Sequence, residues 1–389
     1  MRRACITAAA LAVMLLCAGC DSDSGTIYAN YRELENIEIV QTLGLDRVPG
    51  GGYTVTVSAG AGGQSDTPLV IAGKGSSIPA AMEQVQRRCA KEELFYAHTR
   101  YVLVGEGAAA EGIATLLDFI ERSTQIRLDV QLFIVRGGSA EKLMGDSGTG
   151  ETEISKTLEA VVRDVELSGR SRAFTCSEIA GSLAESGAAL ACAVSAEDIS
   201  KAVKTENDGT IAVPVGYGVF RGPQLIGYLT EDAARGANLL LNHPGTGTVE
   251  LSGATAELIR CKAEMKPQWG EGSAPESLDV HLDARAAIVE LGSKTPTLDA
   301  QAQSRLSREL AETLERQAQE ALEFSIANDA DFLAIGRALE LDDTGRAASL
   351  PSDWLRSLQF TVKCEAQADR TYDIGERANT EGRGIGNAE

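Results

Sequence analysis

Apolar residues recur with two alternating spacings along the first half of the chain. Apolar residues at every second position predict a β-strand, whereas apolar residues three and four positions apart predict one face of a helix. Helical spacing is clear in Ile113, Leu116, Leu117 and Ile120. The nearly continuous apolar run at 130–135 is typical of a central strand. These spacings predict strand, turn and strand at 32–58, helices at 76–91, 111–122 and 154–165, and strands at 101–104 and 130–135.

The second half begins with two strands joined by a tight turn. Residues 215–229, with RGPQ at the centre, are typical of a hairpin. Thr230 follows as a good N-cap for a helix that runs to Leu241. Further on, the pattern predicts a long alternating strand at 278–288, a long amphipathic helix at 301–327 with a polar outer face, and a last strand at 360–364. The order predicts an α+β fold of mixed, largely antiparallel sheets with amphipathic helices, in two to three modules.

Composition changes between these halves. Residues 168–208 are rich in Ala, Ser and Gly and end in a charged run, which places the main domain boundary near residue 208. The expected organisation is therefore an N-terminal α+β region at 20–208 and a C-terminal domain at 209–375. The charged, Gly-rich residues 376–389 are expected to be a disordered tail.

The first 19 residues have the pattern of a signal peptide. Arg2 and Arg3 precede an apolar stretch, and small residues then stand before Cys20. The stretch 4–19 is shorter than the roughly 20 residues that span a bilayer as a helix. A plain secretory signal would leave Cys20 without a role. The favoured interpretation is a bacterial lipoprotein signal, in which Cys20 receives the lipid. The neighbouring Cys17 is a poor acceptor because Leu16 precedes it.

The net charge of −20 restricts the partners of the folded body. No basic cluster is present, so nucleic acid is excluded as an expected partner, because phosphate contacts require Lys and Arg. Anionic headgroups would also repel this body. A lipid on Cys20 would supply the membrane attachment that charge does not.

No motif for catalysis or cofactor binding emerges. GDSGTGET at 145–152 has the spacing of a phosphate-binding loop, but Glu151 stands where the lysine belongs, and a flexible connector is the better interpretation. His98, His243 and His281 are not at metal-ligand spacing from other ligands. A Ser or Cys nucleophile with a distant His stays open, although no GxSxG motif supports it. We expect no enzyme, no cofactor and no metal site.

The cysteines beyond Cys20 indicate no disulfide framework. They are odd in number and include no CxxC pair: Cys89, Cys176, Cys192, Cys261 and Cys364. A single disulfide between Cys176 and Cys192 stays open at this point.

Several stretches, in this order, resemble a known family. They include YRELENIEIVQTLGLD, GKGSSIPAAMEQV, LFYAHTRYVLVGEGAAAEGIATLLDFIER, VGYGVFRGPQLIGYLTEDAARGANLL and ELAETLERQAQEALEFSIANDADFLAIGRAL. The series is similar to the Ger(x)C spore germination lipoproteins, the C subunits of GerA-type nutrient germinant receptors, over about residues 20–375. No single stretch decides the resemblance; their collinear order does.

The resemblance implies a non-enzymatic subunit, lipid-anchored (for example by palmitate) on the outer face of the spore inner membrane. Its partners would be the integral-membrane A and B subunits, and its fold an α+β arrangement in three modules. Candidate contact surfaces are the hairpin at 215–229 and the helix at 301–327, whose polar face is equally consistent with plain solvation. A solute-binding lipoprotein of an importer is the alternative, although the antiparallel strands argue against its repeated βαβ units. A secreted hydrolase is the least favoured.

Overall fold

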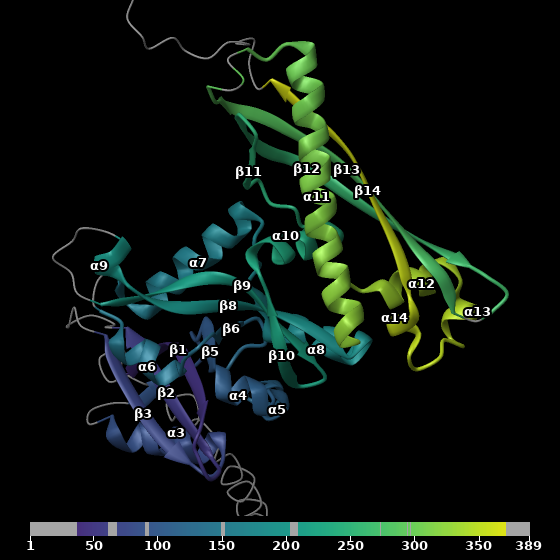
Figure 1. Cartoon of the computed structure of the whole chain (residues 1–389). Coiled ribbons are helices and arrows are strands. Elements are labelled where there is room, and N and C mark those ends of the chain that lie inside the picture. Colours follow the sequence, from purple (N-terminus) through teal and green to yellow (C-terminus); the bar gives the residue numbers. More distant parts are fainter. Residues whose placement is uncertain are drawn as a thin grey trace, which may run out of the picture.

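Two β-sheets and the helices around them make up the computed structural model of the chain (Figure 1). It describes residues 37–60, 68–89, 93–148, 152–202, 209–272, 274–293, 295 and 297–370. The predicted signal peptide 1–19, Cys20 and the predicted tail 376–389 lie outside the described residues, as do residues 149–151 of the glycine motif.

The first sheet has a parallel centre and antiparallel edges. Its order is β10-β9-β8-β6-β5-β1-β2-β3, with β4 beside β1 and β7 beside β6. Neighbours β1, β5, β6 and β8 run parallel, whereas β2, β3, β9 and β10 run antiparallel to their neighbours. Its strands are β1 (Ile37–Arg47), β2 (Tyr53–Gly60), β3 (Leu69–Gly75), β4 (Glu93–Phe95), β5 (Tyr101–Gly105), β6 (Gln131–Val135), β7 (Phe174–Thr175), β8 (Ala188–Asp198), β9 (Thr210–Arg221) and β10 (Gln224–Leu229).

Helices cover both faces of this sheet, and each covered face is mainly apolar. One core cluster joins the sheet to the first group of helices, and a second joins the opposite face to the other group. The first group is α3 (Ile78–Arg88), α4 (Glu106–Glu111), α5 (Ala114–Arg122) and α8 (Cys176–Ser186). The second is α6 (Ala140–Asp146) and α7 (Ile154–Ser168), and the short α9 (Ile199–Ala202) follows β8.

One sequence prediction for this region is confirmed with a shifted start, and another needs correction. The helix predicted at 111–122 is α5, which begins at Ala114. A break at Gly112, whose φ is 125°, separates it from α4. The left-handed backbone of Gly112 is strained for other residues and ends the first helix. The Ala-, Ser- and Gly-rich stretch before residue 208 also contains α8 and the buried strand β8, which the composition did not predict.

The second sheet is longer and narrower, in the order β11-β12-β13-β14. Its strands are β11 (Thr248–Leu251), β12 (Ala254–Trp269), β13 (Pro275–Leu291) and β14 (Gln359–Arg370). The predicted alternating strand is confirmed within β13, which pairs antiparallel with β12 and parallel with β14. Three short helices, α12 (Ile335–Asp342), α13 (Thr344–Ala347) and α14 (Trp354–Ser357), lie between α11 and β14 in the chain.

The predicted long helix is confirmed as α11 (Ala300–Asn328), which runs beside the second sheet (Figure 1). Its apolar stripe, including Leu306, Leu310 and Leu314, is fully buried. Part of its polar face binds the edge of β14. The Glu315 carboxylate accepts a hydrogen bond from the backbone N–H of Cys364 at 2.7 Å, and the Ser307 hydroxyl accepts one from Ala368 at 2.9 Å. α11 thereby satisfies N–H groups that an edge strand would leave open.

The predicted fold class, α+β with mixed sheets, is confirmed. The hairpin β9–β10 is also confirmed, and it completes the edge of the first sheet although it follows residue 208. The domain boundary near that residue stays a prediction. A third core cluster runs without a break from β9 through α10 (Glu231–Leu240) and α11 into the second sheet.

Candidate functional site: a polar junction between the two sheets

α10 lies between the first sheet and α11, and it packs against elements of both halves of the molecule (Figure 1). Thr230 caps it as predicted, since its hydroxyl accepts a hydrogen bond from the N–H of Ala233 at 3.3 Å. Residues 233–240 are all buried, including two polar side chains one turn apart, Arg235 and Asn238. A helix buried on every side that still carries an arginine and an asparagine needs specific partners for both.

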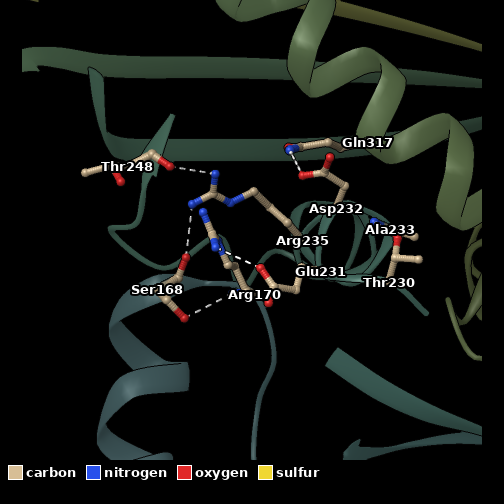
Figure 2. Close-up of polar contacts among 9 residues, drawn as sticks. All are labelled: Ser168, Arg170, Thr230, Glu231, Asp232, Ala233, Arg235, Thr248 and Gln317. Atoms are coloured by element: carbon tan, nitrogen blue, oxygen red, sulfur yellow. Dashed lines mark hydrogen bonds and ion pairs between the residues drawn. The ribbon is translucent and has the colours of Figure 1, made fainter. Parts of the chain in front are cut away.

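Arg235 joins the end of α7 to the start of β11 (Figure 2). Its Nη1 donates to the carbonyl oxygen of Thr248 at 2.8 Å, and its Nη2 donates to that of Ser168 at 3.1 Å. Ser168 is the last residue of α7, so its carbonyl lies at the negative end of the helix dipole, which favours a cation. A Cβ atom on Gly247 would overlap Nη2 of Arg235 and the Ser168 carbonyl. The guanidinium is thus held tightly between backbone segments.

Asn238 holds the connection that follows α7. Its Nδ2 donates to the carbonyl oxygens of Gly169 at 2.9 Å and Ser171 at 3.3 Å. Its Oδ1 accepts a hydrogen bond from the Tyr217 hydroxyl of β9 at 2.6 Å. Asn238 is 1% exposed and Tyr217 is 0% exposed. One amide therefore pairs three buried groups from two segments, the connection after α7 and strand β9.

The first turn of α10 makes charged and polar contacts in two directions (Figure 2). Glu231 pairs with Arg170 at 2.8 Å, on the side of α7. Asp232 accepts a hydrogen bond from Gln317 of α11 at 2.9 Å. On the next turn, Gly236 packs so closely on α11 that a Cβ atom would overlap the backbone carbonyl of Gln317. The junction combines hydrogen bonds to α7 with close helix packing on α11.

The Asn238→Ala substitution is expected to lower the free energy of unfolding by about 2 kcal/mol. It leaves the Tyr217 hydroxyl and two buried carbonyls without their partner, and buried polar groups without partners are costly. Urea unfolding followed by circular dichroism would measure the change. Asn328→Ala is the matched control, because the Asn328 amide bonds only the Phe324 carbonyl of its own helix. The control is expected to stay within about 0.5 kcal/mol of the wild type. Equal losses in the two variants would contradict the role assigned to Asn238.

A groove lies on the other side of the junction, between α8 and the helices α12–α14, with a volume of about 880 Å³. Ion pairs cross it or border it: Arg221 with Asp329 at 3.0 Å, and Arg337 of α12 with Glu185 of α8 at 4.0 Å. Asp331 lies in its wall and accepts hydrogen bonds from the N–H groups at the start of α12, although burial raises the pKa of its carboxyl. Both arginines named here have a carboxylate partner.

The structure does not bring the three histidines together. His98 and His243 are exposed, and His281 lies on the long strand β13. Across the described residues, no three His, Cys, Asp or Glu side chains form a group that could hold a metal ion. His243 follows α10 and borders the groove, where burial and then the positive charge of Arg172 lower its pKa.

Cys176 and Cys192 are both free thiols, so the open possibility of a disulfide between them is not realised. They belong to different core clusters, since Cys176 is the first residue of α8 and Cys192 lies on the face covered by α6 and α7. Burial raises the pKa of each thiol to about 12. Neither would be a thiolate nucleophile at neutral pH.

The sequence pattern predicts the role of Thr230 but not those of Arg235 and Asn238. A signal was present, because ARGAN at 234–238 places two polar residues three apart among Ala and Gly. In the described part of the chain, no helix combines the length and apolar character needed to cross a bilayer.

Comparison with known proteins now gives this architecture a family. The profile of the spore germination protein N-terminal domain matches residues 30–196, and that of the spore germination B3/GerAC-like C-terminal domain matches residues 215–372. The chain belongs to the Ger(x)C family of spore germination proteins. The predicted resemblance is confirmed, and α10 lies inside the second of the two matched regions.

Individual Ger(x)C relatives are distant. The Bacillus subtilis (strain 168) protein YfkR, named for spore germination, is 25% identical over 54% of this chain and 51% of its own length. Spore germination protein KC of the same strain is 27% identical over 29% of this chain and 31% of its own length. The chain thus matches about half or less of these curated relatives.

A solved structure, the crystal structure of the GerBC protein, shares the fold. The TM-score is 0.52 at 15% sequence identity, and the match covers 84% of this chain and 96% of that chain. At this identity the likeness concerns the fold alone.

Proposed function

We propose that this chain is a lipid-anchored, non-enzymatic subunit of a nutrient germinant receptor. In this proposal the chain is attached through Cys20 to the outer face of the spore inner membrane and assembles there with integral-membrane A and B subunits. The observation that carries the proposal is the match of both Ger(x)C domain profiles, which cover residues 30–196 and 215–372. The importer-lipoprotein alternative has no comparable support.

The junction supports a role in assembly rather than chemistry. Both Nη atoms of Arg235 and the amide of Asn238 bond backbone and side-chain groups of the chain itself, and these bonds connect α7 and β9 to α10. Because these bonds hold the two sheets in a fixed relative position, a partner would meet both sheets as one rigid surface. The proposed lipid anchor would confine the chain to the membrane that holds its partners. Two proteins held at one membrane have a high effective concentration, so weak contacts between them are sufficient.

The two surfaces predicted to contact partners, the hairpin β9–β10 and α11, are not equally free to do so. β10 is an edge strand of the first sheet, and its Ile226 is 36% exposed. On α11, by contrast, Ser307, Glu315 and Gln317 already bond other parts of the chain. We therefore favour the hairpin β9–β10 over α11 as the contact surface for a membrane subunit.

Deletion of the gene tests the proposal most directly, in a strain from which other germinant receptors have been removed. Spores lacking the chain are expected to lose their response to the nutrient of this receptor, because a receptor without one subunit does not assemble. Germination is measured by loss of optical density. A non-nutrient trigger that bypasses receptors serves as the control and should act normally, and the intact gene should restore the nutrient response. Full nutrient germination of the deletion strain would contradict the proposal.

A further inference from the structure

Arg235 has a hydrogen-bond donor that the chain leaves unused. The side chain is 3% exposed, and both Nη atoms bond carbonyl oxygens. Its Nε–H has no partner among the described residues. A buried charged donor without an acceptor is costly, and native structures almost always supply one from the protein, water or a ligand.

A second guanidinium lies beside it, that of Arg170 (Figure 2). Arg170 donates through Nη1 to Glu231, and its side chain is 50% exposed, so its other N–H groups are available. Burial lowers the pKa of Arg235, and the positive charge of Arg170 lowers it further. Two neighbouring cations of which one is desolvated would be stabilised by an anion between them.

The space for such an anion is a cavity of about 940 Å³ between α7, the start of α10 and β11. Arg170 and Arg235 both line it, together with the backbone or side chains of Ser168 and Thr248. The carboxylates of Asp164, Glu231 and Glu257 line it as well. A singly charged ligand fits this mixed lining better than a doubly charged phosphate, because each added negative charge is repelled by those three carboxylates.

We propose that this cavity binds a small monocarboxylate between Arg170 and Arg235. The carboxylate accepts a free N–H of Arg170. The Nε–H of Arg235 has no accessible surface in the unliganded chain, so binding must shift the side chains around it before it can donate to the second carboxylate oxygen. Charge-assisted hydrogen bonds of this kind are the strong ones, and arginine suits planar carboxylates. The ligand would contact α7, α10 and β11 at once, so its binding would tighten the junction. The proposal does not depend on the receptor function proposed above.

The test titrates sodium acetate, as the simplest monocarboxylate, into the full chain in detergent at constant ionic strength. Isothermal titration calorimetry and thermal unfolding are read in parallel, with sodium chloride as reference. We expect saturable acetate binding and a rise in melting temperature that chloride does not reproduce. Sodium phosphate forms the third arm, and tighter binding of phosphate than of acetate would overturn the assignment to a monocarboxylate.

Substitutions of single arginines test whether acetate binds between Arg170 and Arg235. Arg170→Gln removes a half-exposed charge and should keep the fold, yet weaken acetate binding at least ~10-fold, the loss expected for one charge-assisted bond. Arg163→Gln is the matched control, because Arg163 is an exposed arginine of α7 that does not line the cavity. Arg235→Lys retains the charge without Nε and should weaken binding as well. Equal affinity in Arg170→Gln and wild type, or no acetate effect beyond that of chloride, would overturn the proposal.

Discussion

The Gly236→Ala substitution is expected to lower the free energy of unfolding by about 3 kcal/mol, the upper part of the range for overpacked cores. A Cβ atom at this position would overlap the carbonyl oxygen of Gln317, which is backbone and has no rotamer to move. α10 and α11 would have to separate. The separation would also lengthen the Asp232–Gln317 hydrogen bond, which is 2.9 Å in the intact junction.

Gly181→Ala provides the matched control for that loss. Gly181 also lies inside a helix, α8, but a Cβ atom there would have no heavy atom within 4 Å. Because alanine favours helix over glycine by about 1 kcal/mol, this variant is expected to be slightly more stable than wild type. Urea unfolding of the two variants, followed by circular dichroism, compares them. A loss of stability in Gly181→Ala equal to that in Gly236→Ala would show that the cost is general to helix glycines and not to the junction.

Sequence reasoning succeeded where local signals decide the structure. The stripe of Leu306, Leu310 and Leu314 predicts α11, because apolar residues that recur with the helical period form one face that packs against the core. Thr230 predicts the start of α10, because an N-cap acts on the N–H groups that follow it directly. The strand 278–288 alternates because only one of its faces is buried, and it lies within β13.

The missed elements depend on distant parts of the chain. Residues 188–194 of β8 are mostly small and carry little periodic signal, and they form a strand because β6 and β9 pair with β8 on both sides. The Ala-rich composition predicts a domain boundary close by and no strand, yet all seven of these residues are buried. Tertiary pairing overrides local preference in such cases.

The candidate site could not be predicted from the sequence for the same reason. Arg235 and Asn238 would be surface residues on an ordinary amphipathic helix. They are buried because α7, β9, β11 and α11 surround α10, and these elements are separated from it in sequence by up to about a hundred residues. The partners are mainly backbone carbonyls, which no residue type in the sequence marks.

The Cys20→Ala substitution is expected to move the protein from the membrane to the soluble fraction of the spore. The folded body carries most of a net charge of −20. Without lipid on Cys20, that charge would oppose binding of the body to an anionic membrane. Fractionation of disrupted spores by ultracentrifugation, with immunodetection of the chain, measures the distribution.

Cys17→Ala is the control for this experiment, since it changes a nearby cysteine of the same apolar segment and should leave the protein in the membrane fraction. Nutrient germination is measured in both strains. Release should slow the Cys20→Ala strain at least ~10-fold, because tethering commonly raises effective affinity by 10² or more without new contacts. Retention of the Cys20→Ala protein on membranes would contradict the anchor while leaving the receptor role standing. Release with unchanged germination would instead show that partner contacts alone are strong enough, and that confinement by the lipid is not what holds the subunit in its receptor.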